Sequence, residues 1–143
     1  PELLYVRDVY KQIVADGFKD RAKYNKLFCT QTFNVLYTKA YAMQYDNDGN
    51  MVDLFFDSDF WSDSQDPDGA IAKKVYKFRE NENSMIVAVD LWWNVGDGYG
   101  NTVYVEVVKE LGNGSDYKIC DFWDSNIEGS WMQWMKNYVA ANQ

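Results

Sequence analysis

The chain has 143 residues, of which 22 are Asp or Glu and 14 are Lys or Arg, and it contains no His. Its net charge of −8 argues against nucleic acid and against anionic membranes as partners, because both are bound through clusters of Lys and Arg. The absence of His excludes Ser-His-Asp and Cys-His catalysis and most zinc sites. The length is typical of one domain, and we expect a single domain over residues 1–143.

The acidity is concentrated in one segment. Residues 46–68 contain eight Asp and no Lys or Arg, so the rest of the chain has 14 acidic and 14 basic residues. The chain is also rich in aromatic residues, with 6 Trp, 11 Tyr and 8 Phe. Such rings fill protein cores, but they also line ligand pockets.

The first third of the chain is predicted to be helical. Between residues 2 and 15, apolar residues recur every three or four positions, the period of one helix face, and Asp16-Gly17 ends the pattern. Asp20 is placed to cap a second helix. Thr30 precedes a third helical pattern that reaches Tyr41.

Residues 46–69 have no sustained period and contain two turn signals, one at 47–49 and one at 67–69. The run 46–57 has the length of a calcium-binding loop, but Met51 replaces Gly at its sixth position and Asp57 replaces Glu at its twelfth. We therefore favour a hairpin turn there. The short run 51–56 predicts either a strand or a hydrophobic plug.

From residue 70 the period becomes two, which predicts strands at 71–78, 85–95, 102–111 and 117–123. The links at 80–83, 96–101 and 112–116 are short and polar or rich in Gly, so neighbouring strands should pair as antiparallel hairpins. Alternation places Val87, Val89 and Leu91 on one face of the second strand. It places Asp90 and Trp92 on the other.

The chain ends in a predicted helix that begins after Ser130, which forms a capping-box pattern with Gln133. Its broad apolar stripe must be covered, either by docking on the sheet, which we favour, or by a partner. The predicted fold class is therefore α+β, with N-terminal helices packed on a curved antiparallel sheet of about four strands and with a C-terminal helix.

Three short stretches carry a resemblance: Phe28-Cys29-Thr30, the segment 57–66 with its Trp and Gln-Asp pair, and the strand 117–122. Together they resemble a family of exported bacterial domains of unknown function within the nuclear-transport-factor-2-like, or cystatin-like, superfamily. The resemblance covers most of residues 3–123. It implies a bent sheet whose mouth is filled by helices, an unassigned cleft, a periplasmic or secreted location, and a homodimer that forms through the open sheet face.

The cleft of such a fold is the first candidate site. Aromatic walls with a few polar groups are typical of small-molecule pockets. Carboxylates beside apolar walls can serve as acids or bases. The predicted ligand-binding residues are Tyr37, Tyr41, Asp90, Trp92, Tyr104 and Asp121.

The acidic loop is the second candidate, because crowded carboxylates favour a cation or a basic partner, and we expect Trp61 to be exposed there as an anchor. The alternative is a solvated loop whose Asp side chains cap turns. The loop residues concerned are Asp57, Asp59, Trp61, Asp63, Gln65 and Asp66.

The leading hypothesis is a non-enzymatic exported domain that binds a small ligand or a protein through the aromatic cleft and the acidic loop. The alternative is a lyase or isomerase that uses an Asp and a Tyr in the cleft. We predict no cofactor and no metal centre. We also predict no transmembrane segment, because no apolar run approaches the roughly 20 residues that span a bilayer. Cys29 and Cys120 could form a disulfide or remain as two buried thiols.

Overall fold

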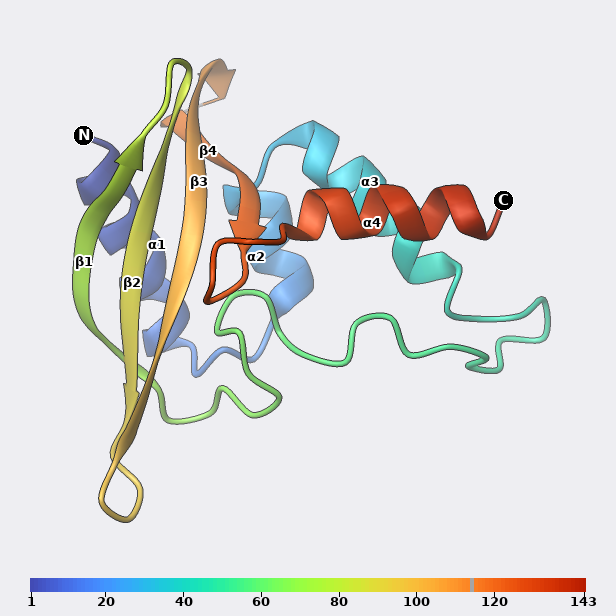
Figure 1. Cartoon of the computed structure of the whole chain (residues 1–143), viewed down its shortest axis with the longest axis horizontal. Coiled ribbons are helices and arrows are strands. Elements are labelled where there is room, and N and C mark those ends of the chain that lie inside the picture. The colour runs from blue at the N-terminus through green and yellow to red at the C-terminus, as the bar shows by residue number, and fades with distance from the viewer. Residues whose placement is uncertain (114) are drawn as a thin grey trace.

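The computed structural model describes residues 1–113 and 115–143, and it confirms the predicted α+β fold class (Figure 1). In chain order the elements are α1 (Glu2–Ala15), α2 (Arg21–Phe28), α3 (Gln31–Ala42), β1 (Ile71–Glu80), β2 (Ser84–Trp93), β3 (Tyr99–Asn113), β4 (Ser115–Trp123) and α4 (Trp131–Ala141). The strands pair antiparallel in the order β1-β2-β3-β4, as predicted. Of the expected link 112–116, Gly114 lies outside the described residues.

Three of the helices begin where the sequence predicts. Asp20, Thr30 and Ser130 each accept a hydrogen bond from the backbone N–H three residues ahead, which satisfies a donor that the first helical turn leaves free. These short polar side chains therefore define the N-termini of α2, α3 and α4.

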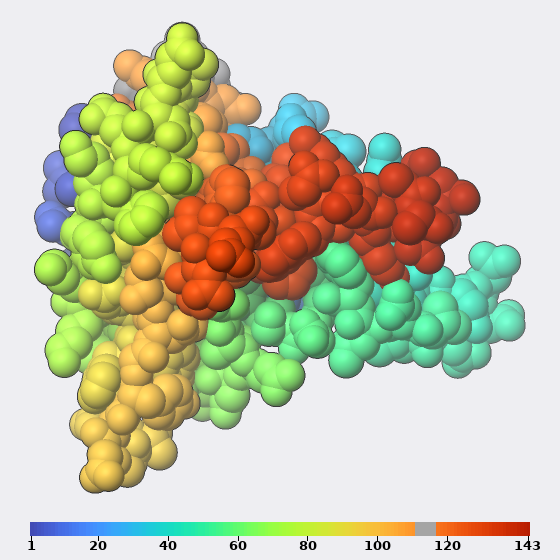
Figure 2. Space-filling model, viewed as in Figure 1, coloured from blue at the N-terminus to red at the C-terminus, as the bar shows by residue number. Residues whose placement is uncertain are grey.

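The helices and the strands form two layers. α1 packs against β1 and β2, while α3 and α4 pack against each other and against β4. Figure 1 shows α1 behind the sheet, and α3 and α4 extending side by side away from β4. In the part of the chain that the structure describes, no helix covers the opposite face of the sheet, which we call the outer face and which is turned toward the viewer in Figure 2.

Aromatic rings fill the space between the helices and the sheet. Phe60 lies between Phe33 of α3 and Phe122 of β4, with ring centroids 5.4 Å and 4.8 Å away, and the Trp61 centroid lies 4.7 Å from that of Phe122. All four side chains are almost completely buried. The mouth of the sheet is therefore closed by two residues of the acidic loop.

The expectation that Trp61 is exposed was wrong. Its ring is fully buried, its Nε1 donates to Oδ1 of Asn25 over 2.8 Å, and its carbonyl accepts from the Tyr10 hydroxyl over 2.6 Å. Burial of the large ring outweighs the polarity of its neighbours in the sequence, since a buried Trp is stable once its N–H has a partner.

The segment 46–56 begins with the predicted turn and ends under α4. The Asp46 carboxylate accepts the N–H groups of Asp48 and Asn50, both over 2.9 Å, which is the geometry of a capped turn. Two rings near its end then stack on α4: the Phe55 and Tyr138 centroids are 4.2 Å apart, and those of Phe56 and Trp131 are 5.6 Å apart. The plug interpretation therefore holds for the two Phe residues, while Met51, Val52 and Leu54 are exposed. The apolar stripe of α4 docks on this segment as well as on α3 and β4.

The buried position of Phe60 gives a stability prediction. Phe60→Ala should lower the free energy of unfolding by about 3–5 kcal/mol, because the surrounding rings cannot close the cavity. The measurement is urea unfolding followed by circular dichroism. Val35→Ala, on the exposed side of α3, is the matched control and should change stability by less than about 0.5 kcal/mol. Equal losses in the two variants would contradict the central role of the ring cluster.

Candidate binding groove

The structure separates the six predicted ligand-binding residues into three places. Tyr37 and Tyr41 lie on α3, with ring centroids 5.8 Å apart, on the helical side of the sheet. Asp121 is a buried residue of β4, and its side chain contacts the first turn of α4. Asp90, Trp92 and Tyr104 line one groove on the outer face.

The groove has a volume of about 530 Å³ and is formed by side chains of β1, β2 and β3, with Ser125 from the turn after β4 at its border. The strand register explains why these residues meet. Ala88 of β2 pairs with both Tyr76 of β1 and Tyr104 of β3, so the two tyrosines flank a small residue, and Asp90 pairs with Thr102. Side chains of directly paired residues share a face, so the same register brings Tyr76, Asp90, Thr102 and Tyr104 together.

Asp90 is held in place by two hydroxyl groups. Thr102 Oγ1 donates to Oδ1 of Asp90 over 2.7 Å, and the Tyr76 hydroxyl donates to the same oxygen over 3.3 Å. Burial raises the pKa of Tyr76, and the Asp90 charge raises it further, so this hydroxyl stays protonated as a donor. Among the described residues, no Lys or Arg lies within ion-pair distance of Asp90. Because both hydroxyls bond to Oδ1, the Oδ2 atom of a fixed carboxylate is left to accept a hydrogen bond.

Glu106 lies on the same face of β3 as Tyr104, two residues further along the strand, and neither of its carboxylate oxygens is free. Its Oε2 accepts from the Ser84 hydroxyl over 2.7 Å, and its Oε1 accepts from Nε1 of Trp123 over 2.9 Å. Both carboxylate oxygens therefore have partners from neighbouring strands. Glu106 is a structural link across the outer face, whereas Asp90 has an oxygen free.

The Trp92 ring lies against the backbone at Gly98 and Gly100, at the start of β3, where the absence of a Cβ leaves room for it. A Cβ atom at Gly98 would be 2.3 Å from Cζ2 of Trp92, and one at Gly100 would be 3.0 Å from Cε3. The Lys73 ammonium lies 4.6 Å from the centroid of the Trp92 ring. The ring is thus a fixed platform whose orientation is set by the two glycines, with a flexible lysine over it.

Asp121 has a structural role at the start of α4. It is 8% exposed, and its Oδ1 accepts the backbone N–H groups of Phe122 over 2.8 Å and of Met132 over 3.0 Å. Burial raises the pKa of this carboxyl group to about 6, although these hydrogen bonds lower it. The carboxylate joins β4 to the first turn of α4.

The acidic loop does not present its carboxylates as one cluster. Asp59 is turned inward and accepts from the Trp61 N–H and the Ser62 hydroxyl, both over 3.2 Å, and burial raises its pKa. Asp63 lies apart, near Asn101, and burial raises its pKa also. Asp57, Gln65 and Asp66 are exposed. Among the side chains that the structure describes, no group of three acidic or Cys side chains is placed to hold a metal ion.

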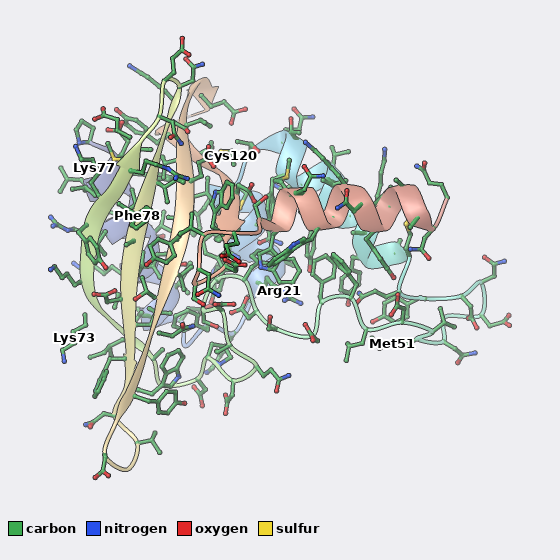
Figure 3. The ribbon with its side chains drawn as sticks, viewed as in Figure 1. Arg21, Met51, Lys73, Lys77, Phe78 and Cys120 are labelled. Carbon is green, nitrogen blue, oxygen red and sulfur yellow. The ribbon has the colours of Figure 1, made fainter. Side chains whose placement is uncertain are left out.

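The two cysteines are free thiols. Burial raises the pKa of Cys29 well above its usual value and that of Cys120 to about 12, so both resist ionisation. Of the two alternatives that the sequence leaves open, the structure has the unbonded one. Figure 3 shows Cys120 at the β4 edge of the sheet.

Sequence reasoning predicted Asp90, Trp92 and Tyr104 and missed the other lining residues, among them Lys73, Tyr76 and Thr102. Thr102 could have been found, because alternation places it on the same face of β3 as Tyr104. Tyr76 and Lys73 could not, because their place beside Asp90 and Trp92 depends on the register of β1 against β2 and on a bulge between Ala72 and Lys74.

Comparison with known proteins assigns no family. No family model matches this chain, and no curated protein or solved structure matches it. Among the residues that the structure describes, none of the helices has both the length and the apolar character needed to cross a bilayer.

The contact between the Trp92 ring and Gly98 can be tested with two glycine variants. Gly98 and Gly96 both have positive φ angles, +83° and +60°, so Ala at either position is strained by about 1–2 kcal/mol. Only at Gly98 does the added Cβ meet the Trp92 ring, since nothing lies within 4 Å of it at Gly96. Gly98→Ala should therefore destabilise the protein more than Gly96→Ala does, and it alone should red-shift the tryptophan emission. Identical effects would show that Trp92 does not rest on Gly98.

The raised pKa of Asp121 predicts a pH dependence of stability. A carboxyl group whose folded pKa is above its unfolded value of 3.8 adds stability that is complete below that value and is lost as pH rises through about 6. The wild type should therefore lose up to about 3 kcal/mol relative to Asp121→Asn between about pH 4 and about pH 7. Urea unfolding of both proteins across this range measures the difference. A constant difference would mean that the carboxyl group titrates normally.

Proposed function

We propose that this chain is a non-enzymatic binding domain and that its ligand occupies the groove of the outer face. The observation that carries the proposal is the Asp90 carboxylate, which Tyr76 and Thr102 fix by one oxygen beside the flat ring of Trp92. A fixed acceptor next to a fixed aromatic surface is the arrangement of a site for a small polar molecule with an apolar face.

The chemistry of the groove favours a polyhydroxylated ligand such as a sugar. The free Oδ2 of Asp90 would accept a hydrogen bond from a sugar hydroxyl, while the C–H face of the sugar ring would pack on Trp92. The Lys73 ammonium at the border adds donors. Because the groove lies on the surface of the sheet, it would take one unit of a longer chain as readily as a free sugar.

Lys73 would move when such a ligand binds. Its ammonium now lies over the Trp92 ring, where a sugar ring would stack, and its side chain is exposed. An exposed contact of this kind contributes only about 0.5–1 kcal/mol, so a ligand would displace it easily. The displaced ammonium would then be a donor at the edge of the groove.

A lyase or isomerase that uses Asp90 and Tyr76 is the second candidate, because the two groups share the groove. The orientation of the hydroxyl favours binding over catalysis. An oxyanion-stabilising Tyr must donate to the substrate, whereas the Tyr76 hydroxyl donates to Asp90.

The family, the location and the homodimer remain proposals. The order of N-terminal helices followed by a four-stranded meander is compatible with the nuclear-transport-factor-2-like type. The same resemblance implies a periplasmic or secreted protein. A homodimer through the outer face would cover the groove, so we expect that ligand and self-association would compete.

Affinity electrophoresis tests the proposed function directly. The wild-type protein is run in native gels that contain xylan, mannan, mixed-linkage β-glucan, starch or polygalacturonate. At least one polysaccharide should retard it. Trp92→Ala should abolish the retardation, and Asp90→Asn should weaken binding by roughly ten-fold through the loss of about 1.4 kcal/mol.

Phe78 provides the matched control for these variants. It lies on the outer face and contacts Tyr104, with ring centroids 4.8 Å apart (Figure 3). It does not line the groove, and 44% of its surface is exposed. Phe78→Ala should leave the retardation unchanged. The proposal fails if no polysaccharide retards the wild type, or if Trp92→Ala binds as well as the wild type does.

A further inference from the structure

Arg21, the first residue of α2, lies among aromatic rings on the helical side of the molecule (Figure 3). Its guanidinium carbon is 5.5 Å from the centroid of Phe60, 5.8 Å from that of Phe56 and 6.0 Å from that of Tyr37. The side chain is half-buried. Three rings therefore hold the cation in one position by cation–π attraction.

This held cation has no ion-pair partner. Among the described residues, the ion pairs within 4.0 Å join Pro1 to Glu2 and Lys77 to Glu80. Arg21 donates one hydrogen bond to the backbone, to the Ser58 carbonyl over a long 3.5 Å, and it also interacts with the Tyr37 hydroxyl. A guanidinium group has five N–H donors, and partial burial makes it costly to leave them unpaired.

The nearest carboxylate is engaged elsewhere. Asp59 contributes an attractive charge to this region, but its Oδ1 accepts from the Trp61 N–H and its Oδ2 from the Ser62 hydroxyl. Asp59 is therefore bound to its own loop and forms no ion pair with Arg21 within 4.0 Å, although the Arg21 charge offsets part of the rise in its pKa that burial causes. The planar fork of Arg21 is left without the oxygen pair that it matches best.

A pocket opens beside this fork. It has a volume of about 290 Å³ and lies between the start of α2 and the acidic loop, with Lys19 and Arg21 on one wall and Ser58, Asp59 and Gln65 on the other. We propose that this pocket is a second binding site, separate from the groove of the outer face, in which Arg21 binds the carboxylate of a small organic acid or of an acidic peptide side chain.

Charge and shape favour a carboxylate over a phosphate. Two carboxylates of the acidic loop, Asp57 and Asp59, line the pocket and would repel a doubly charged phosphate more strongly than a singly charged carboxylate. The volume admits a ligand of a few carbon atoms. The guanidinium fork matches the two oxygens of a carboxylate, and the Lys19 ammonium and the Gln65 amide are further donors at its rim.

Nuclear magnetic resonance offers a direct test, because the chain has only three Arg: Arg7, Arg21 and Arg79. The probes are acetate, succinate and inorganic phosphate, each titrated against sodium chloride of equal ionic strength. The Nε–Hε signal of Arg21 should shift saturably with acetate and succinate, with a dissociation constant on the order of millimolar for such small ligands. Arg79 is the internal control, since it also lies over a ring, that of Phe78 at 6.0 Å, but is exposed; its signal should not move.

Arg21→Lys separates recognition by the fork from simple charge. It keeps the charge and the ring contacts but removes the paired donors, so binding of succinate, followed through the backbone signals of residues 57–59, should weaken by roughly ten-fold or more. Lys23→Gln, an exposed change on the same helix, should leave binding unchanged. An Arg21 signal that does not move in the wild type would overturn the proposal. So would a tighter response to phosphate than to the carboxylates, or equal shifts at Arg21 and Arg79.

Discussion

The structure depends on the burial of Phe60 and Trp61, two rings that come from the most acidic segment of the chain. They reach the core from a loop, and Trp61 stays there because Asn25 accepts its N–H and Tyr10 donates to its carbonyl. Large rings release more free energy on burial than any other side chains, provided that their polar atoms have partners. The loop is therefore a part of the core, and its carboxylates point outward or bond to the loop itself because its rings point inward.

This constraint determines where a ligand can bind. The mouth between helices and sheet, where a cleft would be expected in a bent sheet of this kind, is occupied by Phe33, Phe60 and Phe122. Two surfaces that stay open are the outer face of the sheet and the rim where the loop meets α2. The alternation that buries Val89 and Leu91 also turns Asp90 and Trp92 outward, so the groove is a direct consequence of the core that lies behind it.

Local signals in the sequence predicted the elements well, because caps and periodicity act over a few residues. Asp20, Thr30 and Ser130 begin helices as predicted, and the faces of β2 follow from alternation alone. The grouping of the site residues could not be predicted, since it depends on contacts between segments far apart in the chain. Tyr37 and Asp90 look equivalent in a list of aromatic and acidic residues, yet they lie on opposite sides of the sheet. For the same reason, the composition of residues 57–66 predicts an exposed Trp61, whereas its partners Tyr10 and Asn25 lie on two distant helices.

The net charge of −8 has a different meaning once the chain is folded. A cluster of Asp residues suggests a surface that attracts cations, but the structure disperses them: Asp46 caps a turn, Asp59 bonds to its own loop, and Asp63 lies near Asn101. The same fold places Arg21 at the edge of that loop, held by three rings and without a direct ionic partner. An acidic segment can therefore surround a site for an anion, because recognition depends on which donors and acceptors are left unpaired at short range. The net charge of the protein acts at longer range, and salt screens that long-range effect beyond a distance of about 10 Å.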